Sequence, residues 1–248
     1  MYKVSILFVA VLLLTGPVHA QNTIFLSYGK IEYERRVNVF ARMDNQDDQW
    51  ADFRKKLSNH FKTSYFDLVF TADKSLYRPG RESDDRELFN FWQAPAQDNV
   101  VYSDLGKAET ISQKNIFETK FLIQDSLRQI KWKITDETRV IAGFTCRRAN
   151  AIIMDSIYVV AFYTDEILTG GGPESFTGLP GMILGVSLPH QHITWFATKV
   201  EVLPISESQL EPPVKGKKTD NAELRQTVQP RMKDWGKEGR QYMQDIML

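Results

Sequence analysis

The chain contains one cysteine, Cys146, and a thiol is the side chain here that most readily supports nucleophilic catalysis. A catalytic thiol needs a histidine within hydrogen-bond reach and a lowered pKa. The candidate partners are His60, His190 and His192. The arginines at 147–148 can lower the thiol pKa if a strand ends beside them, so Cys146 is a candidate reactive thiol. It also shares the parity of Phe144 in a predicted strand, and free cysteines are commonly buried, which favours an inert thiol.

Two of these histidines, His190 and His192, are separated by one residue and can share a metal ion. Residues at i and i+2 point to the same side of a strand. A closed metal site needs about four ligands, and no third ligand lies nearby in the sequence. Pro189, just before the pair, predicts a turn at the edge of a sheet, where histidines are exposed. The pair is therefore a weak candidate, and we expect no metal.

A glycine-rich stretch at 170–186 reads GGGPESFTGLPGMILGV and holds 6 of the 14 glycines. It lacks the lysine of a phosphate loop, and its glycines precede a predicted strand instead of opening a helix as in a dinucleotide fingerprint. Ser175 has no glycine on either side, so it does not form a nucleophile elbow. We therefore expect no cofactor, and no catalytic residue can be assigned.

The same stretch suits a corner that returns the chain after a central strand. Pro180 fits the second position of a tight turn, and Gly181 can take the positive φ of a type II turn. The proline also forces Leu179 into an extended conformation, and Phe176 can anchor the loop from its other side. The residues assigned to this structural turn are Gly172, Pro173, Gly178, Leu179, Pro180 and Gly181. A bare glycine backbone can also approach a ligand closely, and this alternative stays open.

Alternation of apolar and polar residues predicts strands along most of the chain. The predicted strands cover residues 31–39, 117–123, 140–146, 157–164, 182–188 and 192–202. The segment 157–164 (IYVVAFYT) is apolar or aromatic on both faces, which is typical of a central strand covered on both sides. This pattern predicts a mainly antiparallel β meander.

Two segments depart from the strand pattern. Residues 47–62 place Trp50, Phe53 and Leu57 on one face, which predicts an amphipathic helix near the amino terminus that packs on the sheet. Residues 211–218 (EPPVKGKK) are typical of a linker, and the segment after Asp220 predicts a weakly amphipathic helix that Pro230 interrupts.

The first residues indicate export. A short basic start, an apolar run at 4–14 and small residues before Gln21 are typical of a secretory signal peptide cleaved after Ala20. We therefore divide the chain into a signal peptide (1–20), a single mainly-β domain (21–210) and a charged, partly helical tail (211–248). The part after the signal has 30 basic and 31 acidic residues, since the signal removes one lysine from 31, and this balance does not suggest nucleic-acid binding.

The core of the glycine-rich stretch, GLPGMIL at 178–184, resembles the signature of the GLPGLI family, a group of exported Bacteroidetes proteins named for that string. Met182 stands where the family name has leucine. AFYT at 161–164 stands where the family usually reads AWYT, so Phe162 replaces a tryptophan, and Leu168 replaces a proline.

Further elements of this resemblance lie on either side. WKIT at 132–135 and IAGFTC at 141–146 are similar to an upstream family segment, and PPVKGK at 212–217 is similar to the family's tail. The resemblance runs from about residue 28 to 218. It implies an exported protein, and it implies no reaction, because the family is defined by its sequence.

The predicted fold class is mainly β with α+β character: a single highly curved antiparallel sheet, similar to a half-barrel, carrying the predicted amino-terminal helix and a charged tail. A curved sheet covered on one side tends to leave an apolar cavity. The residues expected to line such a cavity are Trp132, Phe144, Phe162, Tyr163, Phe176, Leu179 and Trp195. The first functional hypothesis is therefore a periplasmic or secreted binding protein, a carrier for an apolar, lipid-like or amphipathic ligand.

The alternative is a structural partner of an outer-membrane or periplasmic protein assembly, which docks through residues 211–248. Its support is the linker and a weakly amphipathic segment that orders only on contact. An enzyme ranks third, because it needs an alliance between Cys146 and a histidine. No nucleic-acid partner is expected, and after the signal peptide no segment is apolar over the roughly 20 residues needed to span a bilayer.

Overall fold

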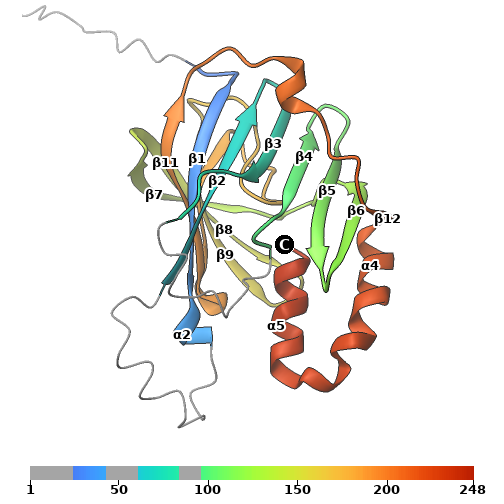
Figure 1. Cartoon of the computed structure of the whole chain (residues 1–248). Helices are drawn as coiled ribbons and strands as arrows, with labels where there is room; N and C mark the ends of the chain where they lie inside the picture. The colour runs from blue at the N-terminus through green and yellow to red at the C-terminus, as the bar shows by residue number, and fades with distance from the viewer. Residues whose placement is uncertain (1–24, 43–60, 84–95) are drawn as a thin grey trace, which may run out of the picture.

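The computed structural model describes residues 25–42, 61–83 and 96–248, and its main element is one open sheet of 12 strands (Figure 1). Across the sheet the order is β12-β6-β5-β4-β3-β2-β1-β11-β10-β9-β8-β7, with every neighbouring pair antiparallel except β12 and β6. The strands are β1 (Gly29–Asn38), β2 (Phe61–Phe70), β3 (Lys74–Pro79), β4 (Val100–Asp104), β5 (Glu109–Ile116), β6 (Thr119–Ser126), β7 (Lys133–Ile141), β8 (Phe144–Ile153), β9 (Ile157–Thr164), β10 (Met182–Leu188), β11 (Ile193–Glu201) and β12 (Lys217–Thr219).

Four predicted strands correspond closely to β1, β9, β10 and β11. In β1 buried and partly buried residues alternate, as the sequence pattern predicts for a strand with one dry face. All but one residue of β9 is buried, which agrees with its apolar character on both faces. The mainly antiparallel sheet predicted from the sequence is therefore confirmed.

Two predicted strands are wrong in the same way, because each contains a turn. Ala142 (φ 49°) and Gly143 (φ 89°) separate β7 from β8, and Phe117 (φ 48°) and Glu118 (φ 55°) separate β5 from β6. Two successive positive φ values match the two-residue turns that suit the twist of a hairpin. Such a turn reverses parity, so Phe144 pairs with Ile141, while Val140 is 69% exposed. Apolar residues on both arms concealed the turn in the sequence.

The helices that cover the described part of the sheet are carboxy-terminal. Most of the amino-terminal helix predicted at 47–62 lies outside the described residues, and its last two positions, Phe61 and Lys62, belong to β2 and contradict the prediction there. The described helices are α2 (Val39–Arg42), α4 (Asn221–Val228) and α5 (Gly236–Ile246), with 3-10 turns η3 (Pro189–Gln191), η4 (Glu207–Leu210) and η5 (Gln229–Trp235). The break predicted at Pro230 is the η5 segment. No described helix is long and apolar enough to cross a membrane.

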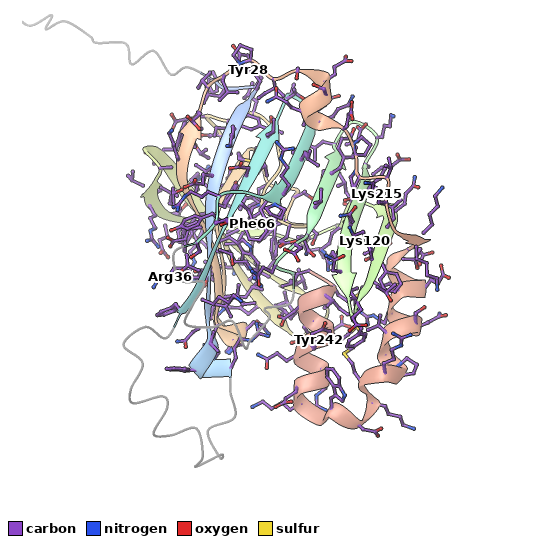
Figure 2. All side chains as sticks on the ribbon, viewed as in Figure 1. Tyr28, Arg36, Phe66, Lys120, Lys215 and Tyr242 are labelled. Atoms are coloured by element: carbon purple, nitrogen blue, oxygen red, sulfur yellow. The ribbon has the colours of Figure 1, made fainter. Side chains whose placement is uncertain are left out.

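The inner face of the sheet can be followed through its register, because directly paired residues share a face. Val101 pairs with Tyr77, Tyr77 with Leu68, and Leu68 with Ile31, and all four are buried. The loop at 165–181 covers this face and buries Phe176 and Leu179 within its core. Figure 2 shows Phe66 amid the dense packing at the middle of the sheet.

The tail helices pack on the same face at its β5–β6 end. Leu224, Val228 and Ile246 join Ile116 and Phe121 in one apolar cluster. Tyr242 of α5, which is labelled in Figure 2, stacks on Phe117 with ring centroids 5.4 Å apart. On the other face, Leu210 of η4 packs on Val69 and Leu76. The apolar sides of α4 and α5 are therefore packed on the sheet.

The glycine-rich loop ends in a tighter turn than the predicted type II turn. The Gly181 amide donates to the Leu179 carbonyl at 2.8 Å, a hydrogen bond that spans only Pro180. Gly181 has φ +142°, and a Cβ there would overlap the main-chain carbonyl oxygen of Thr164 in β9. Gly178 has φ +90° but open space around it, with only the Trp132 indole near, at 3.7 Å. The corner therefore depends most on Gly181.

We expect Gly181→Ala to lower the free energy of unfolding by about 2–5 kcal/mol, since backbone strain and overlap with main-chain atoms add. Gly178→Ala should cost about 1–2 kcal/mol from strain alone. Gly106→Ala is the matched control, because its added Cβ would make ordinary contacts at 3.5 Å or more and its φ is not positive. Urea denaturation of the three variants tests this order. Equal stability of Gly181→Ala and Gly106→Ala would contradict it.

Candidate functional site

An arginine lies on the dry face of β1. Arg35 shares the parity of Tyr33 and Val37 and is 1% exposed. It pairs across the sheet with Trp195, and its guanidinium carbon lies 5.5 Å from the centroid of that indole. Burial lowers the pKa of Arg35. Because an unpaired buried charge is very unfavourable, the inner face must supply an opposite charge.

Glu174, in the glycine-rich loop, is a buried carboxylate whose negative charge favours the charged form of Arg35, as does that of Asp245. The backbone of Glu174 has φ 52°, and its carboxylate is 1% exposed. The Asn99 amide donates to Glu174 Oε2 at 2.9 Å, and Oε1 has no hydrogen-bond partner among the described residues. Burial raises the pKa of Glu174, while Lys114 and Arg35 oppose this rise. The loop therefore delivers a carboxylate to a cationic interior.

Lys114 of β5 is the second buried cation. It is 5% exposed, and its Nζ donates to the carbonyl of Ile246 at 3.0 Å. Burial lowers the pKa of Lys114 to about 8, although Glu174 favours the charged form. Lys114 links the buried charges of the inner face to the residues that follow α5.

A hollow of about 290 Å³ adjoins this lysine, between β4–β6, the strand-free segment at 127–129 and the tail. We call it the polar hollow. It is lined by Val101, Thr110, Ser112, Lys114, Asp125, Ser126, Leu127, Arg128, Gln129, Met154, Ser175, Asn221, Arg225, Met247 and Leu248. Burial and the nearby Arg225 both lower the pKa of Arg128, and Asp125 opposes them. Three basic side chains and one acidic side chain line the hollow, and this excess of basic side chains favours an anion. Two of the basic groups, Lys114 and Arg128, also donate to main-chain oxygens of the tail.

A second, larger hollow of about 790 Å³ lies between the tail helices, and we call it the methionine groove. It is lined by Met154, Arg225, Gln226, Gln229, Pro230, Met232, Lys233, Gly236, Gly239, Arg240, Met243, Gln244 and Met247. Met154, Arg225 and Met247 line both hollows, so the two adjoin. Three basic side chains line each hollow, and the methionines make the second one more apolar. We refer to the two hollows together as the trough.

The seven residues predicted to line one apolar cavity do not converge. Trp195 and Phe176 contact edge to face in the core, with ring centroids 5.9 Å apart, and Tyr163 and Leu179 are buried in the same cluster. Phe162 and Phe196 pack together on the opposite face, with centroids 6.5 Å apart. The remaining two, Trp132 and Phe144, are half-buried, and the Trp132 indole donates to the Thr177 carbonyl at 2.8 Å. None of the seven lines the polar hollow or the methionine groove.

Cys146 and the histidine pair are separate features of the structure. Cys146 is fully buried, and burial raises its pKa to about 12. His190 lies in η3 and His192 follows it with φ 55°, so they do not share a strand face as predicted, and both are exposed. Within the described ranges no three side chains among histidine, cysteine, aspartate and glutamate are grouped as metal ligands. His60 lies outside those ranges.

Two buried charges that were not predicted, Arg35 and Lys114, can be recognised in the sequence. Arg35 interrupts the apolar parity of β1, and Lys114 shares the parity of Ser112 and Ile116 in β5. A charged residue at a dry-face position indicates a buried charge that needs a partner. Glu174 had no comparable signal, because only the folded loop turns it inward.

The chain matches one known family over a short segment. A family described as "Protein of unknown function (Porph_ging)" matches residues 152–185, which cover the end of β8, β9, the glycine-rich loop and the start of β10. The match indicates a Bacteroidetes-type family, and it covers too little of the chain to establish membership. No curated protein matches the chain.

Solved structures share the fold. Two structures of PNGF-II, in the C2 and P21 space groups, match with TM-scores of 0.53 and 0.52 at 14% identity. The matches cover 81% and 82% of this chain but 32% and 33% of those chains, so this chain spans about a third of their length. An uncharacterized conserved protein from Thermus thermophilus matches over 78% of this chain and 91% of its own at 4% identity, with a TM-score of 0.39. The likeness to PNGF-II concerns the fold alone.

The lowered pKa of Lys114 makes stability depend on pH. Between the folded pKa of about 8 and the ordinary value of 10.5, Lys114 binds more protons in the unfolded chain than in the folded one. The free energy of unfolding therefore rises as pH rises through this range. Relative to Lys114→Met, the parent should gain stability with a slope of up to about 1.4 kcal/mol per pH unit from about pH 8 to pH 9.5. The urea midpoints of both proteins, measured over this pH range, give the difference. The tyrosines also titrate at high pH, but they are the same in both proteins, so their contribution cancels. Parallel curves would show that Lys114 has an ordinary pKa.

Proposed function

We propose that this chain is an exported binding protein of the cell envelope, and that it binds an amphipathic ligand with an anionic head in the trough. The observation that carries this proposal is the junction of the two hollows at Met154, Arg225 and Met247. A cationic recess and an apolar groove that meet fit a molecule with one charged and one apolar end. The export signal predicted at 1–20 would place the protein where such lipids occur.

The head of the ligand would occupy the polar hollow. Burial and, to a smaller extent, the positive charge of Arg225 lower the pKa of Arg128, and Asp125 opposes them. An anion placed between the two arginines relieves this repulsion and forms charge-assisted hydrogen bonds, which are stronger than neutral ones. Ser112 and Ser175 add hydroxyl groups that hydrogen-bond carboxylate or phosphate oxygens.

The apolar end would occupy the methionine groove. Met154, Met232, Met243 and Met247 line it, and methionine side chains adapt to apolar ligands of irregular shape because they are unbranched and polarizable. Lys233 and Arg240 also line it and are exposed. This position differs from the cavity expected on the sheet itself, whose space is filled by Phe176 and Trp195.

Two alternatives have less support. Docking on an envelope assembly through residues 211–248 would need the tail to be available, whereas Leu224, Val228 and Ile246 already pack on β5 and β6. Thiol catalysis would need a thiolate, and burial raises the pKa of Cys146 to about 12. A binding role therefore fits the described part of the chain better.

Three probes of equal chain length test the proposal: dodecanoate, dodecanol and dodecyltrimethylammonium. We expect dodecanoate to bind most tightly, with dodecanol about tenfold weaker, because one or two charge-assisted hydrogen bonds are lost. The cationic probe should bind weakest. Calorimetric titration measures each affinity. Equal affinity for all three heads, or no binding of dodecanoate, would refute the proposal.

Variants locate the site. Arg225→Gln should weaken dodecanoate binding about tenfold while leaving dodecanol binding unchanged, since it removes a charge from the head site. Met243→Gln should weaken both probes, because it places a polar group in the groove. Lys199→Gln is the matched control, since Lys199 pairs with Glu201 on the exposed part of β11 and lines neither hollow.

A further inference from the structure

Three polar side chains donate hydrogen bonds to the main-chain oxygens of three consecutive residues at the end of α5 and directly after it. Lys114 Nζ donates to Ile246 O at 3.0 Å, Arg128 Nη2 donates to Met247 O, and Ser175 Oγ donates to Leu248 O. Arg128 Nε also donates to Ser175 Oγ at 3.1 Å and so orients that hydroxyl. The donors come from β5, the segment after β6 and the glycine-rich loop. Each of the three main-chain oxygens accepts one side-chain hydrogen bond, as in the recognition of a peptide main chain.

Apolar contacts and one ion pair complete the recognition. Ile246, Met247 and Leu248 are each 5% exposed or less. Ile246 and Met247 join the cluster of Ile116 and Phe121, whereas Leu248 joins the core of the sheet. Just before them, the Asp245 carboxylate pairs with the Arg42 guanidinium of α2, and both side chains are buried. Residues 245–248 are therefore held like a bound peptide, by an acidic anchor and an apolar end.

The segment is attached through weakly stabilised structure. No side chain caps the start of α5 at Trp235, and Gly236 and Gly239 lower its helix propensity. The element packed most extensively on α5 is η5, another part of the tail. Local opening of such a segment needs less free energy than opening of the sheet.

From these contacts we propose that Lys114, Arg128 and Ser175 form a peptide-binding site for a short apolar segment with a preceding carboxylate, and that residues 245–248 occupy it reversibly. The same three side chains line the polar hollow. An anionic head and the main-chain oxygens of 246–248 therefore compete for the same donors. This competition rests on the proposed function, whereas the peptide site itself does not.

A labelled synthetic peptide of residues 240–248, added to the full chain, tests the peptide site by fluorescence polarisation. Asp245→Asn in the chain weakens its own anchor and leaves the three donors intact. We expect this variant to bind the added peptide at least about tenfold more tightly than the parent, because apparent affinity scales with the fraction of open sites. Adding Ser175→Ala and Arg128→Gln to it should abolish the gain. A scrambled peptide is the control and should not bind.

The outcomes separate the inference from the proposed function. If Asp245→Asn does not fold, Ile246→Ala serves instead, because it weakens the packing of the segment and changes none of the three donor side chains. Equal peptide binding by parent and opened variant, or binding that survives loss of the donors, would overturn the peptide site. Dodecanoate should displace the added peptide, because both would use Lys114 and Arg128. Peptide binding without any dodecanoate binding would leave the peptide site standing and refute the proposed function, and dodecanoate binding without competition would refute the shared use of these donors.

Discussion

A buried positive charge on the inner face of the sheet is the constraint on which the other features depend. Arg35 occupies a position that the alternation of β1 reserves for apolar residues, and it cannot remain charged there without a counter-ion. The glycine-rich loop carries the buried carboxylate of Glu174, which favours the charged form of Arg35, and its Gly181 lies close to the main chain of β9. The same loop places Phe176 against Trp195 and Ser175 beside the tail. One loop therefore contributes to the electrostatics of the inner face, to its apolar packing and to the wall of the polar hollow.

The strands could be read from the sequence wherever one face is dry throughout, as in β1 and β9. The hairpins at 142–143 and 117–118 could not, because their turns lack the asparagine–glycine or aspartate–glycine pair that marks such turns. The predicted cavity failed for a different reason. Apolar residues such as Phe162 and Tyr163 alternate between faces, and a list of aromatic residues does not show which face each one occupies.

The site was harder to predict than the fold, because its parts meet only in three dimensions. Lys114 could have been noticed as a charge on a dry face, but Arg128 and Arg225 lie in segments whose sequences look ordinary. The four methionines of the groove have no common spacing in the sequence. One lies in the turn between β8 and β9, and the other three lie in η5, in α5 and directly after α5. The alternative hypothesis of docking through the tail rests on its weak helix propensity, which does not reveal that Leu224 and Ile246 find partners on the chain's own sheet. Shared fold with the PNGF-II structures leaves the function to these local groups.

The central claim is that the polar hollow and the methionine groove form one binding trough. A crystal structure of the protein grown with a fatty acid brominated at its methyl end tests it most directly, because the bromine can be located by anomalous scattering. The account predicts the carboxylate among Lys114, Arg128 and Arg225, and the bromine against Met232 or Met243. A bound fatty acid elsewhere on the chain, with the trough empty, would contradict it.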